Sequence, residues 1–213
     1  MARHSCTPIS VFILCLLVTP VTYAQTTGIG GPYGEYDMAY QGPETLTLFV
    51  VPDGSGDIFD QASLPYGGTA DATITMTLMD ASWLPVAAFP AEDMWLESED
   101  DGLVQCVAGT IADANTDTDG KARWLEPLLA GGQSQALTVI KINGMLLELT
   151  SGVRLSFNSP DINGDLRVDL TDMQLFAVDF FSSYDFRSDF HRDGIVNLSD
   201  IPPMALAIGV ACP

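Results

Sequence analysis

Two runs of twelve residues near the C-terminus repeat the same order of oxygen-bearing side chains. The first run begins at Asp161 and ends at Asp172, and the second begins at Asp189 and ends at Asp200. Both runs place Asp or Asn at positions 1, 5, 9 and 12, and the first run does so at position 3 as well. One acid-rich turn is weak evidence of a site, but two complete runs in tandem are hard to reach by chance. The repeat is therefore the main constraint on how this region folds.

This order of side chains is typical of a loop that encloses a calcium ion. Calcium takes six to eight oxygen ligands, and an EF-hand-type loop supplies them from positions 1, 3, 5, 9 and 12 and from the backbone carbonyl at position 7. The sequence therefore predicts two calcium ions, and the alternative is that both runs are merely solvated Asp-rich turns. The predicted side-chain ligands are Asp161, Asn163, Asp165, Asp169, Asp172, Asp189, His191, Asp193, Asn197 and Asp200, and the predicted carbonyl ligands are those of Arg167 and Ile195.

Two residues depart from the pattern of such loops. Position 6 requires a backbone with positive φ, which favours Gly, but the first run has Leu166 there whereas the second has Gly194. A non-Gly residue in the left-handed conformation costs about 1–2 kcal/mol, so we expect the first site to be the weaker one. His191 brings a nitrogen donor to position 3, where oxygen is usual, and it either binds through water or faces solvent.

A helix is expected after each run. Residues 171–181 have the length of a helix. The prolines at 202–203 fit only a first helical turn, so residues 204–208 are expected to form a short second helix. Val168 and Val196, both at position 8, are expected to form the short strand pairing that joins the two loops.

The duplicated run-and-helix pattern of residues 158–209 resembles the type I dockerins. That resemblance implies a small calcium-dependent helical module that binds a cohesin domain and tethers secreted proteins, often polysaccharide-degrading enzymes, to a scaffold. It also implies recognition residues at positions 10 and 11 of each run, and the alternative is that these residues pack against the protein's own core. The predicted partner-binding residues are Leu170, Thr171, Leu198 and Ser199.

Residues 45–157 carry the pattern of short strands. Residues 72–78 alternate apolar side chains with Thr at a period of two, which is the mark of a half-buried strand. The pair Asn143-Gly144 between two apolar runs predicts a two-residue hairpin turn. About seven strands without an intervening helical pattern favour an antiparallel sandwich. The predicted strands are residues 45–51, 72–78, 94–97, 121–124, 137–142, 145–150 and 153–157.

Three segments between residues 70 and 142 form a further recognisable pattern. They are a strand that ends in Asp at residues 74–80, Leu-Pro-Val at residues 84–86, and Thr-Asp-Thr-Asp-Gly-Lys-Ala at residues 116–122. The pattern resembles a bacterial immunoglobulin-like repeat of the invasin and intimin type, although Trp83 stands where that family usually has a hairpin Gly. The resemblance implies an immunoglobulin-like β-sandwich that acts as a spacer or presentation module and not as a catalyst.

The first 24 residues have the order of a secretory signal peptide. A positively charged start, an apolar run at residues 11–18 and small residues at the end follow one another. A transmembrane helix would need about 20 apolar residues, and Pro20 interrupts the run. We therefore expect a secreted protein, extracellular or at the cell surface, without membrane insertion after cleavage. In that oxidising compartment Cys106 and Cys212 either form one disulfide or stay as two unpaired thiols.

The chain is strongly acidic. It carries 28 Asp and Glu residues against eight Lys and Arg residues, a formal net charge of −20. Such a charge repels phosphate backbones and anionic lipid, which argues against binding to nucleic acid or to a membrane surface. A hydrophobic content of 47% argues against disorder as the reason for the acidity.

These patterns predict a mainly β chain in four parts. The parts are a signal peptide at 1–24, an irregular lead-in at 25–44, an antiparallel immunoglobulin-like β-sandwich at 45–157, and a small α-helical dockerin-like module with two EF-hand-type calcium loops at 158–213. The expected function is non-catalytic, calcium-dependent docking to a cohesin-like or other extracellular protein, with a role in polysaccharide degradation implied by the resemblance.

Two other functions stay open at this stage. One is a structural or adhesive surface protein that uses calcium only for stability. The other is a glycoside hydrolase or its accessory protein, which would need two carboxylates across a sugar cleft, and no such motif is recognisable. A Ser-His-Asp site is disfavoured because His191 is the one histidine after residue 24 and lies in a predicted loop.

Overall fold

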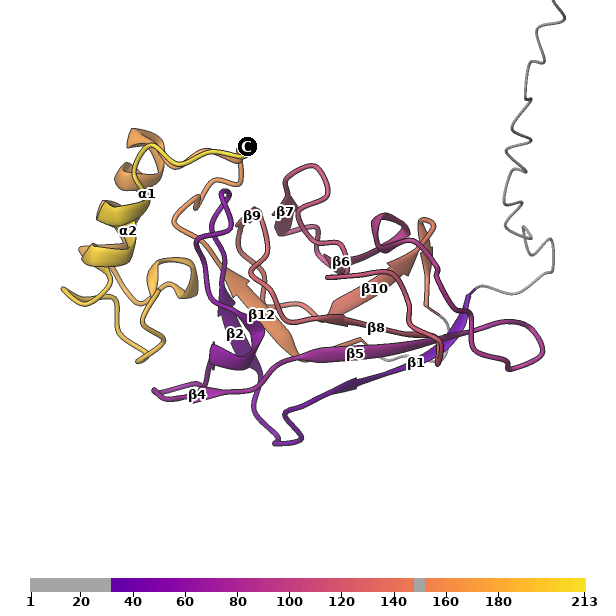
Figure 1. The fold of residues 1–213 in the computed structure, drawn as a ribbon. Helices are drawn as coiled ribbons and strands as arrows, with labels where there is room; N and C mark the ends of the chain where they lie inside the picture. The colour runs from indigo at the N-terminus through magenta and orange to yellow at the C-terminus, as the bar shows by residue number, and fades with distance from the viewer. Residues whose placement is uncertain (1–31, 148–151) are drawn as a thin grey trace, which may run out of the picture.

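The computed structural model describes residues 32–147 and 152–213, which form a mainly β structure with two α-helices near the C-terminus (Figure 1). The predicted signal peptide lies outside the described residues. Within the described ranges, no helix combines the length and the apolar character that a membrane span requires.

The strands and helices follow one another in a β-then-α order. The strands are β1 (Tyr33–Met38), β2 (Leu46–Phe49), β3 (Ala62–Ser63), β4 (Thr69–Ala70), β5 (Ile74–Met79), β6 (Met94–Ser98), β7 (Leu103–Gln105), β8 (Lys121–Trp124), β9 (Ala130–Gly132), β10 (Thr138–Ile142), β11 (Met145–Leu146) and β12 (Leu155–Asn158). The α-helices are α1 (Leu170–Phe180) and α2 (Ile201–Ala207), and the short 3₁₀ helices are η1 (Phe59–Gln61), η2 (Ala91–Asp93) and η3 (Phe186–Ser188).

Strand β5 follows directly from its alternating sequence. Ile74, Met76 and Leu78 are buried in the main hydrophobic core, whereas the threonines between them are partly exposed. β1 pairs with one edge of β5 and β8 pairs with the other, both antiparallel. Trp124 of β8 is fully buried in the same core. A period of two in hydrophobicity has therefore become one buried face of a sheet.

Four small sheets surround this core. Their strand orders are β1-β5-β8, β11-β10-β6, β12-β2-β3-β4 and β7-β9. The strand pairs within these sheets of the described chain are antiparallel except for β12 with β2, which is parallel. A parallel pair needs a long crossover connection, and the whole β region between the two strands supplies it. The prediction of a wholly antiparallel arrangement is therefore wrong for this pair.

Each of the seven predicted strands overlaps an observed strand, but the expectation of an irregular lead-in at residues 25–44 is wrong for residues 33–38. β1 occupies Tyr33–Met38 and pairs along its whole length with β5. Its Gly- and Tyr-containing sequence has no clear period, so the hydrogen bonds to β5 supply the order that the local sequence does not.

The predicted turn between residues 142 and 145 is confirmed. Asn143 and Gly144 both have positive φ, 49° and 79°, and connect β10 to β11 in a two-residue hairpin. The Asp-rich segment before β8 is also a turn, in which the Gly120 N–H donates to the Asp117 carbonyl at 3.0 Å.

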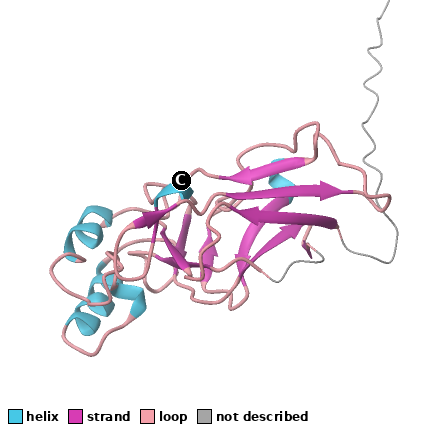
Figure 2. Ribbon diagram, turned by 90° about the horizontal axis from the view of Figure 1, so that it is seen from below, coloured by secondary structure: helices cyan, strands magenta, loops and turns pink. Residues whose placement is uncertain are grey.

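The C-terminal region packs on the outer face of the β12–β2 pair. Leu46 and Leu48 point into the main core, and Phe49, on the other face of β2, contacts a second hydrophobic cluster. The Phe49 ring lies 5.6 Å from that of Phe190, which stacks on Phe176 of α1 at 5.8 Å. Figures 1 and 2 show both α-helices gathered at the end of the molecule beside β2 and β12. The buried members of this second cluster are Val51, Ile162, Val168, Phe176, Phe190, Met204 and Ala207.

A disulfide joins the two regions covalently. Cys106, just after β7, is bonded to Cys212 at the C-terminal end, with Cα atoms 5.7 Å apart and a sequence separation of 106. Of the two states left open by the sequence, the structure has the bridge. The β region and the C-terminal region are therefore held together by both a shared hydrophobic contact and a covalent bond.

Loss of this bridge is expected to destabilise the whole chain. A disulfide that closes a loop of this length limits the unfolded ensemble, and its removal typically costs about 2–5 kcal/mol. The double variant Cys106→Ser with Cys212→Ser should therefore show a free energy of unfolding lower by that amount in urea titrations. Reduction of the unsubstituted protein should give the same shift, and an unchanged urea midpoint in both samples would contradict the prediction.

Candidate functional site

The first acidic run folds into a loop around its own end residues. Asp161, at position 1, accepts hydrogen bonds from the backbone N–H groups of positions 5 and 6 at 3.1 and 2.8 Å. Asp172, at position 12, accepts from the N–H groups of positions 3 and 9 at 3.1 and 2.9 Å. The two carboxylates therefore bind the backbone of the loop from its two ends.

The second run repeats this arrangement bond for bond. Asp189 accepts from the N–H groups of positions 5 and 6 at 3.3 and 3.0 Å. Asp200 accepts from those of positions 3 and 9 at 2.9 and 2.8 Å. Two segments with different intervening residues thus adopt one hydrogen-bonding pattern, which indicates that the shared Asp positions determine the loop.

The backbone conformations of the two loops correspond as well. Positions 4 and 6 have positive φ in both loops, at 70° and 68° for Gly164 and Leu166 and at 55° and 85° for Arg192 and Gly194. The expectation that Leu166 adopts the left-handed conformation is confirmed. Each loop therefore carries one bulky residue in a conformation that favours Gly.

The four carboxylates at positions 1 and 12 are fully buried. Asp161, Asp172, Asp189 and Asp200 each have 0% of their surface exposed. In residues 32–147 and 152–213, none of the four forms an ion pair with Lys, Arg or His. Burial of a carboxylate without a compensating cation is costly, even where backbone amides satisfy its hydrogen bonds.

The electrostatics of the loops reflect this burial. Desolvation raises the pKa of Asp161 to about 6, and the negative charge of Asp172 contributes in the same direction while the Leu166 amide opposes it. Desolvation also raises the pKa of Asp200, with the charges of Asp189 and Asp193 adding to the effect. Both loops are therefore sites at which a cation would be stabilised.

The predicted calcium ligands at the middle positions of the loops hydrogen-bond to one another or to the nearby backbone. The Asn163 side-chain amide donates to Asp165 at 3.0 Å, and the Asn197 amide donates to Asp193 at 3.2 Å. Asp169 is the N-cap of α1 and accepts from the Thr171 N–H at 2.7 Å, in a capping box with the position-12 carboxylate. Hydrogen bonding to that N–H lowers the pKa of Asp169.

With these contacts, the predicted ligands of each loop do not converge on a common point at which an ion could be coordinated. Within the two described ranges, no three His, Cys, Asp or Glu side chains form a group that could hold a metal ion. His191 is exposed, and the Ile195 carbonyl lies 3.4 Å from the Asn197 amide nitrogen. The chemistry of the donors fits calcium, because carboxylate, amide and carbonyl oxygens are the ligands it prefers.

The predicted pairing of Val168 with Val196 is wrong. The Val168 N–H donates to the Val210 carbonyl at 2.9 Å, and the Gly209 N–H donates to the Val168 carbonyl at 2.9 Å. The chain turns at Gly209, where φ is 88°, directly after α2 and returns along the first loop. The terminal segment therefore occupies the strand edge that the second loop was expected to fill.

The predicted partner-binding leucines are on the surface. Leu170 and Leu198 are 71% and 72% exposed, Thr171 is exposed, and Ser199 is half-buried. Neither leucine belongs to a hydrophobic cluster, so the alternative of internal packing is wrong for them. Further exposed apolar residues in the two helices, or directly after α1 in the case of Phe181, are Met173, Val178, Phe181, Ile201 and Leu206.

Sequence reasoning missed an ion pair between the buried Asp179 and the half-buried Arg187, which precedes the second loop. Arg187 donates to both carboxylate oxygens of Asp179 at 2.8 and 2.9 Å, and Ser188 donates to the same carboxylate at 2.6 Å. Burial alone would raise the pKa of Asp179, but these donors hold it below its usual value. The pair ties α1 to η3 and so fixes the start of the second loop. One signal was the presence of Arg187 in a segment otherwise rich in Asp.

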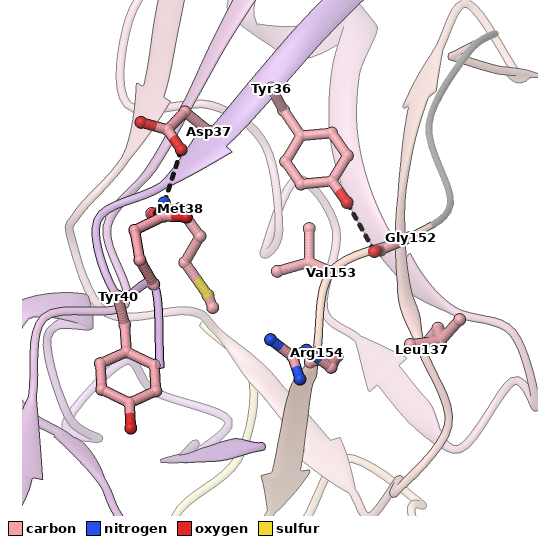
Figure 3. Close-up of a pocket in the computed structure, with 9 residues that line it drawn as sticks. Tyr36, Asp37, Met38, Tyr40, Leu137, Gly152, Val153 and Arg154 are labelled. Carbon is pink, nitrogen blue, oxygen red and sulfur yellow. Dashed lines mark hydrogen bonds between the residues drawn. The ribbon is translucent and has the colours of Figure 1, made fainter. Parts of the chain in front are cut away.

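A separate pocket of about 490 Å³ lies between β1 and residues 152–154 (Figure 3). The Tyr36 hydroxyl points at the Gly152 carbonyl and donates to it at 2.5 Å. Arg154 donates to the carbonyls of Gly42 and Pro43 at 2.9 and 2.7 Å. Because the Tyr36 hydroxyl and the Arg154 guanidinium already have protein partners, this pocket offers less for a ligand than the acidic loops do.

Comparison with known proteins gives no match to any protein-family model, any curated protein or any solved structure.

Relief of strain at position 6 of the first loop provides a test of the loop geometry. Leu166→Gly should raise the free energy of unfolding in chelator by about 1 kcal/mol, because Gly adopts positive φ without steric cost. Gly194→Ala is the matched control, and it should lower stability by about 1 kcal/mol or more, because a Cβ there meets only ordinary contacts but imposes the strain. Urea unfolding measures both changes. A loss of stability in Leu166→Gly would mean that the packing of the Leu side chain outweighs the strain.

Proposed function

We propose that residues 158–213 are a dockerin-like module that binds two calcium ions, one in each acidic loop. The observation that carries this proposal is the set of four fully buried carboxylates, two per loop, in the same hydrogen-bonding pattern and without an ion-pair partner among the described residues. A divalent cation would offset the repulsion within each loop. Calcium is favoured over softer metals because the donors are almost all oxygens.

The residues that would hold the ions are those of the acidic runs. Calcium would have to draw the middle-position side chains inward, away from the hydrogen bonds that they make with one another. In return, the positive charge of the ion would compensate the buried carboxylates of the loop. At position 6 the second loop has the advantage, because Gly194 adopts positive φ freely whereas Leu166 is strained, but at position 4 the first loop has it, because Gly164 stands where the second loop has the strained Arg192. The first site would use Asp161, Asn163, Asp165, Asp169, Asp172 and the Arg167 carbonyl, and the second would use Asp189, Asp193, Asn197, Asp200 and the Ile195 carbonyl, with His191 at its margin.

We further propose that the module docks to an extracellular protein of the cohesin type and has no catalytic role of its own. The support is the exposure of Leu170 and Leu198, because exposed large apolar side chains are a common feature of interaction sites. The disulfide is in keeping with secretion, since such bonds persist mainly in oxidising compartments. The β region would be an immunoglobulin-like sandwich that presents the module, a proposal supported by its mostly antiparallel sheets and single main core.

A second function is favoured by a specific observation. The C-terminal region is bonded through Cys212 to the β region and packs on it through Phe190. The two regions therefore form one packed unit, whereas a docking module is usually joined to the rest of its protein by a linker alone. A structural or adhesive protein that uses calcium only for stability would need this attachment and would need no partner.

Charged substitutions on the exposed face separate the two functions. Leu170→Asp with Leu198→Asp should abolish calcium-dependent capture of a partner from the producing cell's own secreted fraction, because a charge would be buried in the interface. The same variant should keep its thermal midpoint and calcium affinity, since both leucines are largely exposed.

Leu84→Asp is the matched control, because Leu84 is also an exposed leucine but lies on the β region. It should capture the partner as the unsubstituted protein does. Equal capture by the double variant, or capture that persists in chelator, would refute docking through this face and favour the structural function.

A further inference from the structure

A groove of about 370 Å³ lies between the β3–β4 turn and the second acidic loop. It is formed where the C-terminal region meets the β region, and both regions contribute to its walls. Its volume is in the range of small-molecule sites, which combine apolar or aromatic walls with a few polar groups. The residues that line it are Pro65, Tyr66, Tyr184, Asp189, Arg192 and Gly194.

Tyr66 is an unusual residue for its position. It is 87% exposed and has a φ of 68°, although Gly67 and Gly68 follow it in the same turn. Positive φ in a bulky residue costs free energy, and an exposed ring recovers little of that cost by packing. The ring lies beside Gly194, where an added Cβ would be 3.5 Å away. The turn thus holds an aromatic ring at the edge of the groove at a cost to stability.

Arg192 is a second such residue on the opposite wall. It occupies position 4 of its loop with a φ of 55°, where the first loop has Gly164 at 70°. Its guanidinium lies 4.5 Å from the centre of the Phe186 ring, and one of its terminal nitrogens donates to the Tyr184 hydroxyl at 3.3 Å. Its Nε is buried and has no hydrogen-bond partner, and in residues 32–147 and 152–213 it forms no ion pair.

These features make Arg192 a held cation whose charge has no ion-pair partner among the described residues. Stacking on Phe186 and the bond to Tyr184 restrict the guanidinium before any ligand arrives. A guanidinium held in this way binds a carboxylate through two parallel hydrogen bonds. In a chain with 28 acidic residues, an arginine in a groove without an ion pair is suited to an external carboxylate.

The two tyrosines indicate what carries that carboxylate. Tyr66 and Tyr184, the latter half exposed, both line this groove, and a tyrosine combines a flat apolar ring with a polar hydroxyl at its edge. A sugar ring has the complementary form, with C–H groups on its faces and hydroxyls around its rim. A net charge of −20 disfavours polyanions such as single-stranded nucleic acid, which also stacks on aromatic rings. A single arginine matches a single acidic group.

We infer that this groove binds a saccharide that carries one carboxylate, such as an oligosaccharide with one uronic acid residue. Arg192 pairs with the carboxylate, and Tyr66 and Tyr184 cover the sugar rings. The site is separate from the docking face proposed for Leu170 and Leu198. It is linked to the second acidic loop because the Tyr184 hydroxyl donates to Asp189 at 3.1 Å.

Calorimetry of the full chain at fixed calcium tests this inference with cellobiouronic acid and cellobiose, which differ by one carboxylate. The acid should bind at one site, and cellobiose should bind about tenfold more weakly, since a charge-assisted hydrogen-bond pair is lost. Arg192→Gly should weaken binding of the acid by about tenfold and should keep or raise the urea midpoint, because the first loop already uses Gly at this position.

Tyr66→Gly should also weaken binding of the acid, because it removes the ring and relieves the turn. The matched control is Trp83→Gly, since Trp83 is another exposed aromatic residue with positive φ, at 61°, but does not line the groove. Equal affinity for the acid and cellobiose, or unchanged affinity in Arg192→Gly, would overturn the inference. So would an equal loss in Trp83→Gly. A triglutamate peptide that binds as tightly as the acid would assign the groove to carboxylates of peptides instead.

Discussion

Burial of like-charged carboxylates is the constraint on which the C-terminal region depends. Four Asp side chains between residues 161 and 200 are fully buried, and each is held by two backbone N–H groups of its own loop. These bonds set the path of both loops, the positive φ at positions 4 and 6, and the capping box that starts α1. They satisfy the hydrogen-bonding capacity of the oxygens but leave their charge uncompensated, and a bound cation would remove that imbalance.

The attachment of the C-terminal region to the β sheets determines which of its residues are covered and which remain exposed. Phe190 and Val51 join the two regions through apolar contact, and Cys106–Cys212 joins them covalently. Attached on this side, the C-terminal region leaves Leu170 and Leu198 exposed. The attachment also creates the groove between Tyr66 and Arg192, which neither region could form alone.

Much of this could be predicted from local sequence. Seven of the twelve strands in the described residues and both helices are expected from the sequence pattern and the proline positions, and the left-handed Leu166 follows from the spacing of the Asp residues. Features that depend on distant partners could not be predicted. β1 gains its order from pairing with β5, the first loop pairs with the C-terminal segment at Val210, and the Asp179–Arg187 pair forms only once α1 and η3 are packed. None of these contacts produces a periodic pattern in the local sequence from which it could be predicted.

Calcium titration of the full chain by calorimetry tests the central claim most directly. The buried carboxylates predict two bound ions, with Asp161→Asn and Asp189→Asn each removing one of them and leaving the other in place. Absence of calcium binding by the unsubstituted protein, or two ions that persist in both variants, would contradict the assignment of the acidic loops as calcium sites.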